Sequence, residues 1–381
     1  MKHLSQFALI FLLLSCSGKE QSESSKSENV LENLTYSVDT VMVDAGDEVI
    51  NLRHGARFSA VSLDAQRYYY YDYNKIAINE IDLQTLEVTD IYQFSKEGPN
   101  SIGFNLPNIQ PLRNSRFFFA SSANVGIYSN SGEKEKSLKF NFKEIDGLDI
   151  DEGGLITNQA KISHDGKLMF ALSSPYHTPT DVRVIIVEPE IKKGKTISLP
   201  NFIPTLKFKV HLKEEKRVMG VREGVQLNIL NNVILITSSS TSDTYIYDYQ
   251  IDSLRLIEFP HQLVSLKKSG EIKNEVGDEN EFYAEWAKFK YQISFDKFLW
   301  DEERQQYFRF GYQLIPHEDR ELEKKSEVFL FAYDKNLNLI GETQLDEIEY
   351  RFESPFFKDG KLWSYVNVED ELGFAIFTFD F

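Results

Sequence analysis

The residue with the most distinctive chemistry in this 381-residue chain is Cys16, because the sequence contains no second cysteine. A disulfide would need another thiol, and a zinc site would need further cysteines or histidines at ligand spacing, which position 16 lacks. A short basic start precedes an unbroken apolar run, Phe7 to Leu14. The run is far shorter than the roughly 20 residues that span a bilayer, and it is typical of the core of a secretory signal peptide. An ordinary buried cysteine is the alternative.

The segment Leu13-Leu14-Ser15-Cys16 resembles the lipobox of bacterial lipoproteins. The resemblance implies that residues 1–15 are a signal peptide and that the mature chain begins at Cys16, acylated on its thiol, for example with palmitate, and on its new amino terminus. Several acyl chains, at about 0.8 kcal/mol per buried CH₂, anchor a protein stably. We therefore expect an outer-membrane lipoprotein of the cell envelope. Whether it faces the periplasm or the cell surface stays open.

The segment after the cysteine and the overall charge limit the possible partners. Residues 16–33 are rich in serine and charged residues, which predicts a disordered tether. The chain has 59 acidic and 42 basic residues, for a formal net charge of −17. Such an acidic protein is a poor partner for nucleic acid and for anionic lipid. Contact with the membrane is therefore predicted through the acylated Cys16 only.

Catalytic and metal-binding motifs are absent from the sequence. It contains no G-x-S-x-G, no H-E-x-x-H and no phosphate-binding loop, and its histidines are dispersed. Asp149 and Asp151 resemble the start of a calcium loop, but the next ligand position is Gly153. We predict no catalytic residue, no metal and no cofactor. An enzyme stays open, because residues distant in sequence can meet in a folded site.

The elements that must position any site repeat along the chain. Short runs rich in Tyr, Phe and Ile are typical of strands, and six tight polar turns lie near residues 64, 114, 165, 231, 302 and 359. Each turn joins the first two strands of a four-strand unit. The pattern predicts an all-β fold, a six-bladed β-propeller of four-stranded antiparallel blades over residues 34–381. A two-sheet sandwich is the alternative.

The last unit has only three strands before the chain ends at Phe381, and the strand at 34–44 has no partner near it in sequence. Pairing 34–44 with 372–381 would complete the last blade and cover an open edge. We therefore predict that the N-terminal strand closes the last blade.

Three segments resemble known propeller families. Lys96 to Gly103, KEGPNSIG, resembles a loop of Bacteroidetes-type six-bladed propeller lipoproteins, and residues 298–312 resemble an uncharacterised domain-of-unknown-function branch of that group. The SHDGK segment at 163–167 is similar to a turn of TolB-like propellers. The resemblance implies a propeller fold and an envelope location, and it supplies no catalytic residue.

The long connections of the repeat fall on one predicted face, the usual location of binding residues. They are 144–156, 173–181, 200–217, 261–292 and 313–326, and a helix is predicted near 279–290, either packed on the rim or covering the channel. Candidate ligand-binding residues follow the second strands: Asp72, Asn74, Ser121, Asn124, Ser174, Tyr176, His177, Ser239, Tyr312 and Asn367. Ordinary turn chemistry also explains their types.

These features favour a lipid-anchored binding module that presents its loop-rich face to an unidentified protein, peptide or glycan. The alternative is a propeller hydrolase or lyase that acts on a carbohydrate or lactone, which rests on analogy of fold alone.

Overall fold

In a computed structural model of the chain, the described residues are 29–103, 108–121, 124–139, 142–148, 155–173, 180–213, 218–317 and 324–381. The anchor residue Cys16 and the predicted signal peptide lie outside them. None of the described helices is long and apolar enough to cross a membrane.

The described strands form six sheets of four strands and one sheet of three. We number the four-stranded sheets in chain order. Sheet 1 contains β2 (Ala60–Val61), β3 (Arg67–Asp72), β4 (Ala77–Asp82) and β5 (Glu87–Gln93). Sheet 2 contains β6 (Asn108–Leu112), β7 (Arg116–Ala120), β8 (Val125–Tyr128) and β9 (Lys134–Ser137). Sheet 3 contains β10 (Leu155–Ile162), β11 (Met169–Ser173), β12 (Arg183–Glu188) and β13 (Lys193–Ser198).

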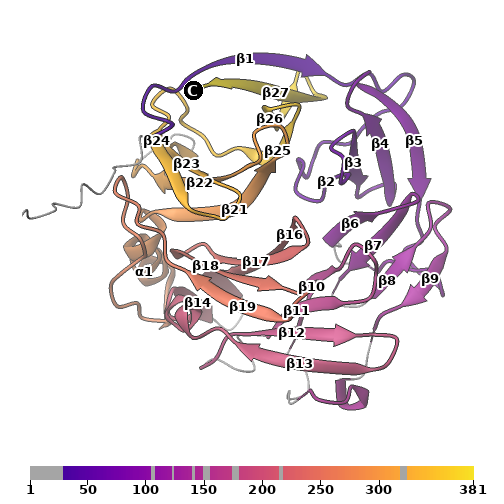
Figure 1. Cartoon of the computed structure of the whole chain (residues 1–381), viewed down its shortest axis with the longest axis horizontal. Coiled ribbons are helices and arrows are strands. Elements are labelled where there is room, and N and C mark those ends of the chain that lie inside the picture. Colours follow the sequence, from indigo (N-terminus) through magenta and orange to yellow (C-terminus); the bar gives the residue numbers. More distant parts are fainter. Residues whose placement is uncertain are drawn as a thin grey trace, which may run out of the picture.

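The remaining four-stranded sheets continue the same order. Sheet 4 contains β16 (Val225–Leu230), β17 (Val233–Ser238), β18 (Thr241–Asp248) and β19 (Ser253–Ile257). Sheet 5 contains β21 (Ser294–Asp301), β22 (Gln306–Leu314), β23 (Ser326–Tyr333) and β24 (Leu339–Gln344). Sheet 6 contains β25 (Glu353–Lys358), β26 (Lys361–Val368), β27 (Glu371–Asp380) and β1 (Thr35–Met42). Figure 1 shows the sheets arranged around a common centre, as in a propeller.

The predicted turns lie where the repeat places them, between the first and second strands of every four-stranded sheet. Several contain residues in the left-handed region, such as Ala65, Asn114 and Asn231, with φ of 52°, 60° and 49°. We call the end of the sheets with these turns the turn face. The opposite end, where second strands connect to third strands, is the loop face.

The predicted closure is confirmed. Strand β1 pairs antiparallel with β27, from Thr35 opposite Asp380 to Met42 opposite Gly373. The two ends of the chain therefore share one sheet, and the otherwise open edge of β27 is covered (Figure 1).

The predicted tether extends too far, because part of it belongs to the folded body. The backbone N–H of Val30 donates to the carbonyl of Ile340 over 3.1 Å, and Leu31 is fully buried beside sheet 5. The Asn29 side chain also forms hydrogen bonds with both backbone groups of Glu342. Residues 29–31 thus extend the outer edge of sheet 5, and the prediction of disorder up to residue 33 was wrong.

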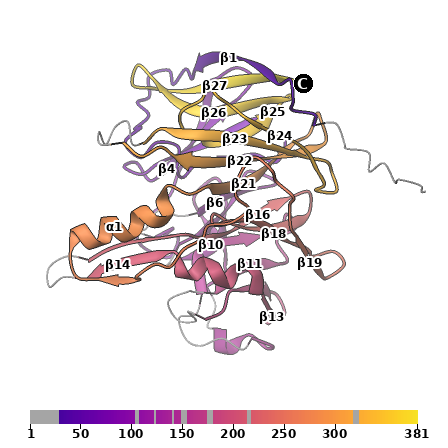
Figure 2. The same cartoon turned by 90° about the vertical axis from the view of Figure 1, so that its left-hand side faces the viewer.

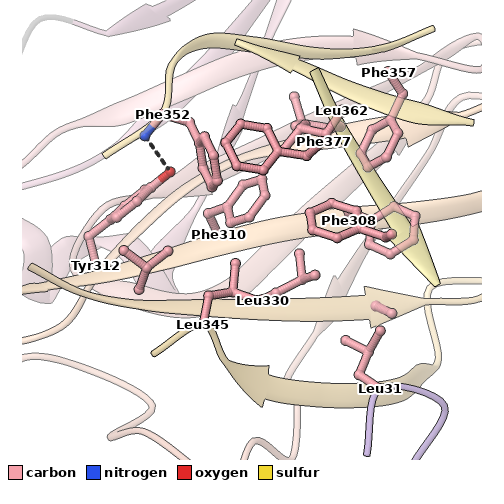
Figure 3. Close-up of a cluster of buried hydrophobic side chains, with 14 of the residues drawn as sticks. Leu31, Phe308, Phe310, Tyr312, Leu330, Leu345, Phe352, Phe357, Leu362 and Phe377 are labelled. Atoms are coloured by element: carbon pink, nitrogen blue, oxygen red, sulfur yellow. Dashed lines mark hydrogen bonds between the residues drawn. The ribbon is translucent and has the colours of Figure 1, made fainter. Parts of the chain in front are cut away.

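Aromatic and aliphatic side chains fill the space between neighbouring sheets. In the cluster between sheets 5 and 6, Phe310 packs against Phe352, whose ring also meets that of Phe377 (Figure 3). Closer to the centre, amide side chains connect the first strands: Asn108 donates to the carbonyl of Ala160, and Asn228 donates to that of Phe298. Sheets 2 and 3, and likewise sheets 4 and 5, are thereby connected both by packing and by hydrogen bonds.

The three-stranded sheet and one helix form a separate unit, which we call the satellite. It contains β14 (Lys209–Lys213), β15 (Val218–Arg222), β20 (Glu275–Val276) and α1 (Glu279–Lys290). The helix confirms the one predicted near 279–290, and Asp278 accepts a hydrogen bond from the Glu281 N–H as its N-cap. Figure 2 shows α1 and β14 projecting on one side and the start of β1, beside the C-terminus, on the other. Two 3₁₀ helices, η1 (Phe142–Glu144) and η2 (Pro200–Lys207), complete the described elements.

Candidate functional site

A cavity of about 320 Å³ lies at the loop face, between sheets 3 and 4 and the satellite. Ser173 ends β11, Val225 begins β16 and Ser239 follows β17, so these sheets contribute their loop-face ends. The satellite contributes Lys209, His211, Arg222 and Glu223. A cavity of this volume suits a small molecule or the end of a larger ligand.

Alternation along β14 decides which side chains face the cavity. Val210 and Leu212 are buried in a cluster with Phe282 and Phe289 of α1. Because successive side chains of a strand point to opposite faces, the helix covers one face of the satellite sheet. The other face carries the polar residues of β14 and β15 that line the cavity, so the helix packs on the satellite rather than covering a channel.

The acidic groups of the cavity wall are already engaged by cations. Asp181 accepts from the Arg183 Nε over 2.5 Å and from the Ser198 hydroxyl over 3.0 Å. Burial raises the pKa of Asp181, but these hydrogen bonds outweigh it and hold that pKa below its usual range. Asp181 is therefore an anion fixed in place by Arg183.

Glu223 is held by a buried lysine. The Lys268 Nζ donates to Glu223 over 2.6 Å and to the Phe289 carbonyl, at the end of α1, over 3.0 Å. Burial lowers the pKa of Lys268, and Glu223 opposes that shift by stabilising the charged ammonium. The backbone N–H of Lys268 also donates to the backbone carbonyl of Ser240, in the turn between β17 and β18. Lys268 thus connects the satellite to the turn that follows β17 in sheet 4.

Hydroxyl groups fix the turn that bears Ser239. The Thr205 Oγ1, in η2, lies 3.0 Å from the Ser238 Oγ and 2.8 Å from the Ser240 Oγ. Ser239 itself accepts from the Gly224 N–H over 3.1 Å, and Ser173 accepts from the Arg183 N–H over 2.9 Å. Among the described residues, neither serine is hydrogen-bonded to an imidazole.

The predicted ligand-binding residues are distributed around the loop face rather than gathered in one site. Asp72 accepts from the backbone N–H groups of Asn74 and Lys75 and closes a turn. Ser121 and Asn124 form a comparable turn. Asn367 accepts from the Asp370 N–H in another.

Tyr312 lies in the core, where its hydroxyl accepts from the Phe352 N–H (Figure 3). Ser174, Tyr176 and His177 lie outside the described residues. Among the described candidates, only Ser239 lines the cavity.

The sequence analysis missed Gln159, Lys209, His211, Arg222 and Gln226, all of which line the cavity. The available signal was the alternation in KFKVHLK, residues 207–213, which places lysine and histidine opposite apolar residues. The repeat pattern instead places this segment in the predicted long connection 200–217. The predicted absence of a metal is untested at Asp149 and Asp151, because both lie outside the described residues. The described residues contain no cluster of three or more potential metal ligands.

Comparisons with known proteins identify relatives but no activity. The chain is similar to the crystal structure of a DUF4221 family member from Bacteroides vulgatus, with a TM-score of 0.61 and 14% identity over 93% of this chain and 99% of that one. It is also similar to a luciferin-regenerating enzyme, with a TM-score of 0.43 and 10% identity over 90% of this chain and 95% of that one. Curated proteins include no significant match. The family described as a domain of unknown function, DUF4221, matches residues 32–344, so the chain belongs to the DUF4221 family.

Proposed function

We propose that this protein is a lipid-anchored binding module of the cell envelope that presents the cavity at its loop face to a small polar ligand or to the end of a peptide or glycan. In this proposal the six four-stranded sheets are the blades of a six-bladed propeller. The satellite is formed by the two connections that flank sheet 4 in the sequence, residues 199–224 and 258–293. The observation that carries the proposal is the position of the cavity relative to the start of the folded chain.

Strand β1 begins at Thr35, opposite Asp380, at the turn face. The cavity lies at the loop face, where Ser173, Val225 and Ser239 lie. Figure 2 shows the same separation, with α1 and β14 on one side and the start of β1 on the other. A chain anchored through Cys16 would therefore be attached from its turn face, with the cavity at the opposite end.

The chemistry of the cavity favours binding over catalysis. Its wall combines hydrogen-bonding side chains with apolar ones such as Leu172, Val182 and Phe208. Hydrogen-bonding groups orient a ligand, and apolar groups contribute contact area. The two serines are bonded to backbone groups, which supports a binding module over the hydrolase or lyase alternative.

Gly224 provides a direct test of the cavity. A Cβ atom added at this position would meet no atom within 4 Å, so we expect Gly224→Leu to fill part of the cavity without disturbing the fold. Gly277 is the matched control, because it is also open and lies outside the cavity. We expect glycan and peptide arrays to detect a ligand that binds the unaltered protein and the Gly277→Leu variant but not Gly224→Leu. Equal binding to all three proteins would contradict this site.

Two further measurements test the rest of the proposal. Protease treatment of intact cells, compared with cells whose outer membrane is permeabilised, reports on which side the body lies. Metabolic labelling with a palmitate analogue should modify the protein and should fail after Cys16→Ser. Turnover of a glycoside, ester or lactone that Gly224→Leu abolishes would instead support the enzyme alternative.

A further inference from the structure

The acidic side chains of the cavity wall are already paired within the protein. The Arg183 Nε lies 2.5 Å from a carboxylate oxygen of Asp181, and the Lys268 Nζ lies 2.6 Å from one of Glu223. Removing a partner from a buried ion pair is strongly destabilising, so these pairs are not readily opened by a ligand. A positively charged ligand therefore finds no unpaired carboxylate among the described residues of the wall.

The basic side chains of the wall offer little to an anion. His211 and Arg222 each have an interaction partner already. Lys209 is half-buried, and a long lysine side chain lines a cavity with its stem while its ammonium reaches water. A charged ligand would give up its own hydration for groups that are engaged or hydrated themselves. The wall therefore favours a neutral ligand.

Two amide side chains of the wall, in contrast, are not engaged. Gln159 of β10 and Gln226 of β16 line the cavity from the first strands of neighbouring sheets. The Gln159 Oε1 is buried without a hydrogen-bond partner. Neither side chain makes a hydrogen bond within the described part of the chain. A buried polar atom without a partner destabilises the empty protein, so its place in a cavity wall indicates a role when the cavity is filled.

The backbone of β10 sets the position of Gln159. The register between β10 and β11 shifts between Ile156 and Lys161, so Gln159 lies in an irregular stretch of the strand. Bulges of this kind are frequent next to active sites, because they change the direction of a side chain. The last torsion of a glutamine is broad, so the amide can turn either its oxygen or its nitrogen toward a ligand. An amide offers one acceptor atom and two donors, which matches neighbouring hydroxyl groups.

We propose that the cavity binds a neutral sugar, as the end of an uncharged glycan, through hydrogen bonds between its hydroxyl groups and the amides of Gln159 and Gln226. This inference rests on the proposed binding function and specifies the ligand class. Phe208 and Val225 also line the cavity and supply apolar surface for the C–H groups of the sugar ring. A peptide end fits less well, because its ammonium or carboxylate would need a counter-charge that is already engaged.

The test is calorimetric titration of the full-length protein with the methyl glycosides of glucose, galactose, mannose and N-acetylglucosamine, with glucuronate and galacturonate, and with trialanine. We expect at least one neutral sugar to bind, and to bind more tightly than both sugar acids and the peptide. Its affinity should change little with salt, because the ligand carries no charge. Binding of no neutral sugar, or tighter binding of a sugar acid or of the peptide, would overturn the inference.

Two variants test the amides. Gln159→Met and Gln226→Met remove the amide groups and keep the length of the side chain. Each should weaken binding of the neutral sugar about tenfold, because each removes hydrogen bonds to the ligand. Gln250→Met is the matched control, since Gln250 is exposed between β18 and β19 and lies outside the cavity. Affinities of both cavity variants equal to that of the control would contradict recognition by these amides.

Melting temperatures of the empty proteins separate a binding role from a structural one. Gln159→Met should melt at or above the unaltered protein, because it removes a buried polar atom that has no partner. A lower melting temperature would mean that Gln159 supports the fold and would overturn its role in recognition. If a peptide or a sugar acid binds and Gly224→Leu removes it, the proposed function stands while this ligand class does not. If every ligand still binds Gly224→Leu, the proposed site itself is wrong.

Discussion

At the scale of single residues, His261 is a titratable side chain inside the core. It is buried, with its ring centre 4.2 Å from that of Phe331. Its Nε2 lies 3.2 Å from the Tyr333 hydroxyl, and its Nδ1 lies 3.5 Å from a Glu342 carboxylate oxygen. Burial lowers the pKa of His261, although Glu342 partly opposes the shift. The folded protein therefore favours the neutral imidazole.

Because the pKa of His261 is lower in the folded chain than in the unfolded chain, the unfolded state binds the proton first as the pH falls. The contribution of His261 to stability is present above the unfolded pKa of about 6.5 and is lost as the pH falls through the folded value. We expect the melting temperature to drop between about pH 7 and pH 5, and His261→Gln to show a shallower drop. Parallel pH profiles of the two proteins would contradict this role.

Residue types alone predicted positions on the loop face but not a site. Ser, Asn and Asp at the ends of second strands were correctly placed near turns, because their side chains cap backbone N–H groups there. The same types serve turns and ligands, so the sequence could not separate the two. Tyr312 shows the limit, since its hydroxyl is satisfied by the Phe352 backbone inside the core.

At the scale of elements, one arginine connects sheet 5 to the turn of sheet 4 beside the cavity. Arg309 of β22 is fully buried, and its guanidinium donates to the carbonyls of Asp296, Ser242 and Ser238 over 2.6, 2.7 and 3.2 Å. The group lies 5.0 Å from the ring centres of both Phe295 and Phe298. Arg309 thus fixes the β17–β18 turn, which bears Ser239, against the next sheet.

Replacing Arg309 by methionine keeps much of the packing volume and removes these donors. Three carbonyls, two of them in buried hydrogen bonds, would lose this donor, and a buried unpaired acceptor costs about 1–3 kcal/mol. We expect Arg309→Met to destabilise the protein by about 3 kcal/mol or more in urea unfolding. Arg255→Met, at an exposed position of strand β19, is the control, with an expected change within about 0.5 kcal/mol. A loss for Arg309→Met as small as that of the control would exclude this role.

The satellite shows why some elements escape prediction. Four-stranded sheets form from strands that are neighbours in sequence, so a repeating turn signal reveals them. Strand β14 instead pairs in parallel with β20, where His211 lies opposite Glu275. Strand β20 has only two residues and is distant in sequence from β14, so no local sequence pattern indicates the pairing. Helix α1, in contrast, was predictable from the spacing of Phe282, Trp286 and Phe289.

At the scale of the whole molecule, two separate N-terminal segments hold the ends of the chain together. Residues 29–31 cover the outer edge of sheet 5, where a side chain on Gly341 would come within 2.9 Å of all three. Strand β1 then covers β27 in sheet 6. The closure was predictable because an unpaired strand and an open edge complement each other. The attachment of residues 29–31 was not predictable from the sequence, since its contacts are largely backbone hydrogen bonds and one buried leucine.

Three chains that begin at Glu28, Leu34 and Asp47 separate these contributions. The chain from Glu28 keeps both segments and should melt like the full protein. The chain from Leu34 loses the fully buried Leu31. Burial of a leucine contributes about 1.5–3 kcal/mol, so we expect its melting temperature to fall by a few degrees, about 2 °C or more.

The chain from Asp47 also loses β1, which leaves the backbone groups of β27 unpaired along one edge and uncovers side chains such as Phe377, whose ring lies 6.1 Å from that of Tyr36. We expect this chain to melt well below the other two and to aggregate, because an exposed apolar edge strand pairs with other chains. Differential scanning calorimetry and light scattering measure both effects. Equal melting temperatures for the chains from Leu34 and Asp47 would show that β1 does not close the ring. Equal melting temperatures for the chains from Glu28 and Leu34 would show that residues 29–31 do not stabilise the protein.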